Sequence, residues 1–213
     1  MKNFTLTVAL FGLLMFSLVI PVGASSMWSQ TYGGTEKDGA LSLVQTSDGG
    51  YAMVGYTCSF GAGEDDFWLI KTDEAGNMEW NRTYGGTGSD IAISLIETSD
   101  GGYALVGYTE SFGAGSDDFW FVKTDSSGNM QWNRTYGGTK GDYAFSLVET
   151  SDGGYAIAGY TFSVGAVNSD LWLVKTDEQG VIPEFPSWII LPLFMITALF
   201  VMVIKKKMLA SII

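Results

Sequence analysis

The seven residues Thr-Ser-Asp-Gly-Gly-Tyr-Ala stand at 98–104, and the same seven stand at 46–52 and at 150–156. Each interval is 52 residues, and self-similarity at a fixed interval is the signature of a repeat architecture. A second set with the same spacing is Trp28, Trp80 and Trp132. We therefore expect three copies of one structural unit, at about 28–79, 80–131 and 132–177.

Each copy holds four short runs that are typical of β-strands. The runs are rich in valine, isoleucine, tyrosine, tryptophan and threonine, and turn residues separate them. Ser99-Asp100-Gly101-Gly102 is one such turn, because glycine adopts a positive φ and aspartate binds its own backbone. The sequence therefore predicts an all-β fold with four-stranded repeats. In the second copy the runs are 91–97, 103–109, 119–125 and 130–136.

Four strands in a repeat of this length resemble a β-propeller blade of the kelch-like or quinoprotein-like kind. In quinoprotein-like blades, a strand ending in aspartate leads through a glycine turn to a strand bearing tryptophan. Residues 71–80 read Lys-Thr-Asp-Glu-Ala-Gly-Asn-Met-Glu-Trp, and 123–132 keep this arrangement. The resemblance covers 28–177 and implies the fold. The dedicated ligands of a quinone or metal site in that family have no counterpart that we can identify.

The order of the runs along the chain is permuted relative to whole four-strand repeats. The chain starts with a lone fourth run, Trp28–Tyr32, and its last copy stops after the third run, at Asp177. Propellers usually close with four to eight blades, so three blades need another solution. A six-bladed ring of two chains, an open arc and a closed three-fold packing all stay open. Because an open arc leaves apolar sides exposed, we expect a homodimer or a closed monomer.

The two ends of the chain carry patterns that predict export across a membrane and anchoring in it. Residues 1–24 read as a signal peptide, with Lys2, an apolar run and a small-residue cleavage site. Residues 188–204 carry no charge and predict a transmembrane helix, and 205–213 begin with three lysines that mark the cytoplasmic side. The expected location is the cell membrane, with one span, the repeats outside and the C-terminus inside.

The linker 178–187 contains Pro183-Glu184-Phe185-Pro186. With the apolar stretch and the basic end, this resembles the PEF-type C-terminal sorting signals of archaeal surface proteins. The resemblance implies that a transpeptidase cuts the tail and that a lipid replaces it. The alternative is a rigid proline-spaced linker into a plain membrane anchor.

The charge balance narrows the partners. All 23 acidic residues lie between Glu36 and Glu184, and 11 − 4 = 7 of the basic residues lie there, so this part carries 7 − 23 = −16. Nucleic acid is therefore an unexpected partner, because phosphate binding needs clustered lysine and arginine.

The chain has no histidine, which removes the commonest general base, and its single cysteine, Cys58, allows no internal disulfide.

Acidic pairs recur in the loops between the second and third runs. If the fold is a propeller, these loops share one end with the loops that carry Asp38, Asp90 and Asp142. Oxygen ligands of this kind suit Ca²⁺, and no other cofactor is expected. The alternative is that these acids only build turns. The candidate calcium ligands are Asp65, Asp66, Asp117, Asp118 and Asp170.

Other positions suggest modification and recognition. Asn81 and Asn133 lie in Asn-Arg-Thr sequons, so a glycoprotein is expected. We expect the Trp68 and Tyr51 series to form the core between repeats, so ligand contacts belong at positions that vary between copies. Two sets of such positions are Lys37, Gly88 and Lys140, and Cys58, Glu110 and Phe162.

Together these features predict a membrane-anchored extracellular β-repeat module that binds a protein or a glycan and catalyses nothing. The alternative is a polysaccharide hydrolase or lyase that uses the loop aspartate pairs.

Overall fold

The computed structural model describes residues 27–165 and 168–183, and every regular element in this part is a β-strand. The strands form two four-stranded sheets and one three-stranded sheet, all antiparallel. The first sheet has β1 (Asp38–Gln45), β2 (Tyr51–Thr57), β3 (Asp66–Thr72) and β4 (Met78–Tyr84). The second has β5 (Asp90–Glu97), β6 (Tyr103–Thr109), β7 (Asp118–Thr124) and β8 (Met130–Tyr136). The third has β9 (Asp142–Glu149), β10 (Tyr155–Thr161) and β11 (Asp170–Thr176).

Each sheet is a simple meander, in which every strand pairs with the next one along the chain. The turn between β5 and β6 depends on Gly101, whose φ of 79° is open only to glycine without strain. Thr98 and Gly102 close this turn with a backbone hydrogen bond of 2.9 Å. The all-β class and the four runs of the second repeat are therefore confirmed, with strand bounds that differ by at most one residue.

The core lies between the sheets, which pack face to face. The ring of Phe67 on β3 lies 4.5 Å from that of Trp120 on β7, and Phe119 lies 4.8 Å from Trp172 on β11. Complete burial of one phenylalanine contributes about 1.5–3 kcal/mol, so these repeated contacts hold neighbouring sheets together. Trp68 and Trp120 are buried and Trp172 is half-buried, which confirms that this series belongs to the core.

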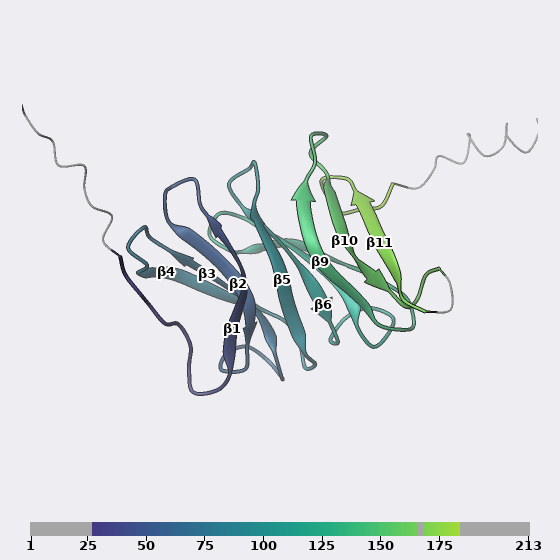
Figure 1. Ribbon diagram of the computed structural model, residues 1–213, viewed down its shortest axis with the longest axis horizontal. Helices are drawn as coiled ribbons and strands as arrows, with labels where there is room; N and C mark the ends of the chain where they lie inside the picture. Colours follow the sequence, from purple (N-terminus) through teal and green to yellow (C-terminus); the bar gives the residue numbers. More distant parts are fainter. Residues whose placement is uncertain (1–26, 166–167, 184–213) are drawn as a thin grey trace, which may run out of the picture.

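The three sheets stand in an open row, with β1, β5 and β9 side by side (Figure 1). Strands of the first sheet pack against β5, and strands of the second sheet pack against β9. The far face of β11 keeps Leu171 and Leu173 exposed. Of the two expected arrangements, closed packing within one chain is not seen in the part described, and the homodimer stays a prediction. The third repeat contributes three strands in this part rather than four.

The N-terminal run Trp28–Tyr32 lies against the first sheet and not beside β11. The Trp28 ring is 5.8 Å from that of Tyr51, and the Tyr32 hydroxyl donates a 2.6 Å hydrogen bond to the carbonyl of Gly76. The run has no strand partner in the described residues. Sequence spacing alone could not show which sheet it would join.

The predicted signal peptide 1–24, transmembrane helix 188–204 and basic tail 205–213 lie outside the described residues, as do residues 184–187 of the linker 178–187. Within residues 27–165 and 168–183, no helix has the length and apolar content needed to cross a membrane.

Candidate functional site

The loops between sheets gather along one edge of the row, at the same end of every sheet, and this edge is here called the loop end. The amide of Asp90, which follows β4, donates to the carbonyl of Asp65 at 2.6 Å, and the amide of Asp142 donates to the carbonyl of Asp117 at 2.7 Å. The connection that leads into one sheet is thereby joined to the long loop of the preceding sheet. The two kinds of loop share one end, as predicted.

Three of the five predicted calcium ligands are buried. They are Asp117 and, at the first positions of β3 and β7, Asp66 and Asp118. Asp66 Oδ2 accepts 2.6 Å from the amide of Ala62, and Asp118 Oδ2 accepts 2.7 Å from the amide of Ala114. Burial raises the pKa of Asp66, and the charges of Asp90 and Asp65 add to that shift. These carboxylates hold their own loops.

Asp65 contacts side chains in two loops, and Asp117 contacts β9. Asp65 accepts from the hydroxyl of Ser89 at 3.0 Å and from the thiol of Cys58 at 2.9 Å. Asp117 Oδ2 accepts from the hydroxyl of Tyr143 at 2.6 Å. Asp170 is half-buried at the start of β11. In residues 27–165 and 168–183, no three acidic, histidine or cysteine side chains are grouped to hold a metal, so the calcium site stays a prediction.

A cluster of aromatic rings lies next to Asp117, and we call it the aromatic patch. It consists of Tyr108, Tyr143, Phe145, Tyr160 and Phe162. Tyr143 lies 4.9 Å from Tyr108 and 5.1 Å from Tyr160, between ring centroids. Phe145 stacks on Tyr160 at 5.4 Å with an interplanar angle of 29°, and Phe162 meets Tyr160 edge-on at 5.6 Å. Phe145 and Phe162 are exposed, so the patch presents ring surface to solvent.

The patch stands where the third repeat departs from the other two. Phe162 occupies the position of Cys58 and Glu110, which sequence reasoning had singled out as variable. That reasoning missed Tyr143, which stands where the other copies have Gly39 and Ile91. It also missed Phe145, an aromatic residue where they have the aliphatic Leu41 and Ile93. A copy-by-copy comparison at the start of β9 is the signal that finds both.

The chemistry of the patch suits recognition. Burial raises the pKa of the Tyr143 phenol, and its hydrogen bond to Asp117 raises it further. The phenol therefore stays neutral at physiological pH and holds the carboxylate beside the rings. Apolar ring faces next to fixed oxygen acceptors can receive a ligand that has both an apolar face and hydroxyl groups.

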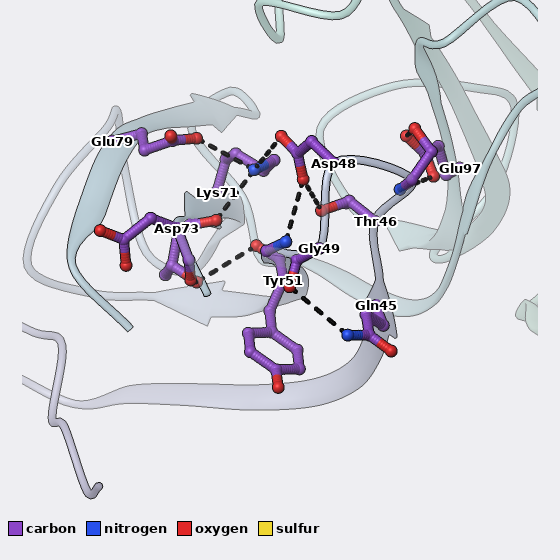
Figure 2. A network of polar contacts seen from close by, with 12 residues as sticks. Gln45, Thr46, Asp48, Gly49, Tyr51, Lys71, Asp73, Glu79 and Glu97 are labelled. Atoms are coloured by element: carbon purple, nitrogen blue, oxygen red, sulfur yellow. Dashed lines mark hydrogen bonds and ion pairs between the residues drawn. The ribbon is translucent and has the colours of Figure 1, made fainter. Parts of the chain in front are cut away.

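The edge of the row opposite the loop end carries a repeated ionic network, one copy of which is drawn in Figure 2. The buried ammonium group of Lys71 lies 2.8 Å from Asp48 and 2.9 Å from Glu79. Burial opposes the charge of Lys71, but the hydrogen bonds to Asp48 and Glu79 outweigh it and raise the pKa. Glu97 of the second sheet accepts two hydrogen bonds from Ser47, both at 2.8 Å. This network fixes the turns and ties adjacent sheets together.

The two sequons lie on the outer strands β4 and β8. Asn81 and Asn133 are both exposed. The indole of Trp68 donates to Asn81 Oδ1 at 3.2 Å, and that of Trp120 donates to Asn133 Oδ1 at 3.3 Å. Both asparagine side chains are therefore exposed, and their glycosylation stays a prediction.

No protein-family model matches this sequence. An alignment of 123 residues, at 29% identity, covers 51% of this chain and 13% of the regulatory protein FlaEY of Caulobacter vibrioides. Since the chain spans so small a share of FlaEY, this similarity shows no family and transfers no role.

Proposed function

We propose that this chain is a non-catalytic binding module of the cell surface and that the aromatic patch binds its ligand. The observation that carries the proposal is the stack of the exposed Phe145 on the half-buried Tyr160, which lies beside the buried Asp117. The ligand classes are a glycan or a protein, and the patch favours a glycan. A sugar ring offers an apolar face to the aromatic rings and hydroxyl groups to the carboxylate.

The proposal of binding without catalysis follows from what the loop acids do. Hydrolysis of a glycosidic bond needs two carboxyl groups that flank the bond, one of them as an acid. Asp66 and Asp118 are buried and bound to their own loops, and Asp117 is bound to Tyr143. These contacts favour a structural role for the pairs over the hydrolase alternative.

The surroundings of the module are proposed from the sequence. The signal peptide and the apolar C-terminal stretch place the repeats outside a membrane, held by one span or by a lipid after tail cleavage. Exposed Asn81 and Asn133 fit a glycosylated outer surface. We also infer that the three sheets are propeller-like blades, because they are meanders whose first strands lie side by side.

A glycan array probed with the purified protein tests the proposed function. We expect a defined group of glycans to bind, and Phe145→Ala and Phe162→Ala each to weaken the tightest of them roughly fivefold, since a stacked ring contributes about 1 kcal/mol. The matched control is Phe112→Ala, because Phe112 is an exposed ring in the corresponding loop of the second repeat. It should bind as the unchanged protein does.

The alternative predicts a different result. If the protein depolymerises a polysaccharide and Asp117→Asn abolishes this turnover, the module is an enzyme and the proposal is wrong. Equal loss of binding in Phe112→Ala and Phe162→Ala would show that the patch is not the site.

A further inference from the structure

The first and the last sheet of the row each present an exposed apolar face. On the other sheets, the equivalent face is covered by a neighbouring sheet. On the first sheet, Leu43 is 60% exposed, whereas its equivalents Leu95 and Leu147 are each 3% exposed. An open groove of about 670 Å³ runs beside Leu43, and Trp28, Tyr51 and Met53 also line it. Leu95 and Leu147 are covered by the preceding sheet, and Leu43 has no such sheet in the described residues.

On the third sheet, the opposite apolar face is exposed. Leu171 and Leu173 on β11 are 84% and 66% exposed. Their equivalents on β3 are Phe67 and Leu69, which are completely buried against the second sheet. The outer face of β11 is therefore apolar in the same places, but nothing in the described part covers it.

These two faces are the two halves of a contact that the chain makes twice internally. Between the first and second sheets, Phe67 and Leu69 share one core with Leu95 and Leu105. Between the second and third sheets, the residues at the same repeat positions share the next core. The face around Leu171 is equivalent to one side of this internal contact, and the face around Leu43 is equivalent to the other side. The two faces are therefore complementary, and a second copy placed in line with the first would bring them together.

The run Trp28–Tyr32 supplies a second, independent observation. The hydroxyls of Tyr84 on β4 and Tyr136 on β8 each donate 2.6 Å to a glycine carbonyl of the following sheet. Tyr32 makes the same bond, at the same length, to Gly76 of the first sheet. The run therefore lies where the fourth strand of a preceding sheet would lie, but no such sheet is present in the part of the chain that the structure describes. The third sheet, in turn, lacks a fourth strand in the described residues.

We infer that the chain binds a second copy of itself head to tail, and that Trp28–Tyr32 of one copy becomes the fourth strand on β11 of the other. The register follows from the internal pairs Leu69↔Arg82 and Trp68↔Thr83. Shifted by the repeat interval, it pairs Leu173 with Gln30 and Trp172 with Thr31 of the second copy. The free edge of β11 and both apolar faces are then covered. Two such joints, related by a two-fold axis, close a ring of six sheets.

A disulfide test on the full chain addresses this joint directly. Two differently tagged copies, both with Cys58→Ser, are expressed together in membranes, one with Leu173→Cys and the other with Gln30→Cys. Because these residues lie opposite one another, we expect mild oxidation to yield a disulfide-linked pair carrying both tags. Ser29→Cys in place of Gln30→Cys is the register control. It faces the other side of the strand and should cross-link at least several-fold less.

Disruption is the second arm of the test. Leu171→Asp places a charge on the outer face of β11 and should abolish the cross-linked pair and leave single copies in detergent. Val164→Asp is the matched control, because Val164 is an exposed apolar residue in the loop before β11. The inference would be wrong if no two-tag product forms, or if the register control gives an equal yield. It would also be wrong if residues of the same chain cover Leu173. Glycan binding by the aromatic patch is scored separately and does not depend on these results.

Discussion

At the scale of the residue, glycines and buried carboxylates shape the loop end. Gly113 has a φ of 104°, and an added Cβ would lie 2.0 Å from Asp118 Oδ2. That oxygen accepts from the backbone of its own loop, so the carboxylate cannot move away without breaking those bonds. The sequence showed a glycine-rich loop and an aspartate pair. It did not show that each requires the other, because their contact depends on the folded path of the loop.

We expect Gly113→Ala to destabilise the protein by about 3 kcal/mol or more, from backbone strain and the clash with Asp118 together. Gly101→Ala is the control, since Gly101 also has a positive φ but nothing lies within 4 Å of an added Cβ. That change should cost only about 1 kcal/mol. Chemical denaturation of both variants measures the difference, and equal costs would contradict the structural role given to Asp118.

At the scale of the element, the repeat made the strands predictable and the ionic networks less so. Strand bounds followed from turn residues that recur in every copy. The pairing of Lys123 with Asp100, at 2.8 Å, joins the turn after β5 to the end of β7, and strand prediction alone does not bring these together. The patch residue Phe162 was marked by its variation, whereas Tyr143 and Phe145 lie within β9, where no residue had been singled out from the sequence.

The Asp100 network predicts a loss of stability in acid. Burial would raise the pKa of Asp100, but hydrogen bonds from Lys123, Thr98 and the Gly102 amide outweigh it and lower the pKa to about 2. Because the folded pKa is below the ordinary value of 3.8, this stabilisation is present above about pH 4 and is lost as the pH falls towards 2. Solvent screening of the half-exposed carboxylate limits it to about 1 kcal/mol.

Chemical denaturation between pH 2 and pH 6 measures this effect. Asp100→Asn should flatten the acid limb of the stability curve, whereas Glu64→Gln, at an exposed loop position, should leave it unchanged. An acid limb that is identical in Asp100→Asn and in the unchanged protein would show that the network contributes nothing.

At the scale of the whole molecule, three sheets form a row with complementary ends (Figure 1). The sequence predicted the number of repeats and the apolar faces. It could not place the run Trp28–Tyr32, because strand order within a sheet says nothing of which neighbouring sheet a lone strand will join. The open row arises from contacts between residues far apart in the sequence, such as Phe67 with Trp120. Repeated residues build this row, and three residues that depart from the repeat, Tyr143, Phe145 and Phe162, distinguish the patch.

The most direct test is to restore the repeat at the patch. The triple variant Tyr143→Ile, Phe145→Ile and Phe162→Glu gives the third copy the residues of the second, which are Ile91, Ile93 and Glu110. Calorimetric titration with the tightest glycan from the array, beside a denaturation curve, is the measurement. The account predicts a folded protein with at least a roughly hundredfold weaker binding, from the loss of three aromatic contacts. A folded triple variant that binds the glycan as tightly as the unchanged protein would contradict it.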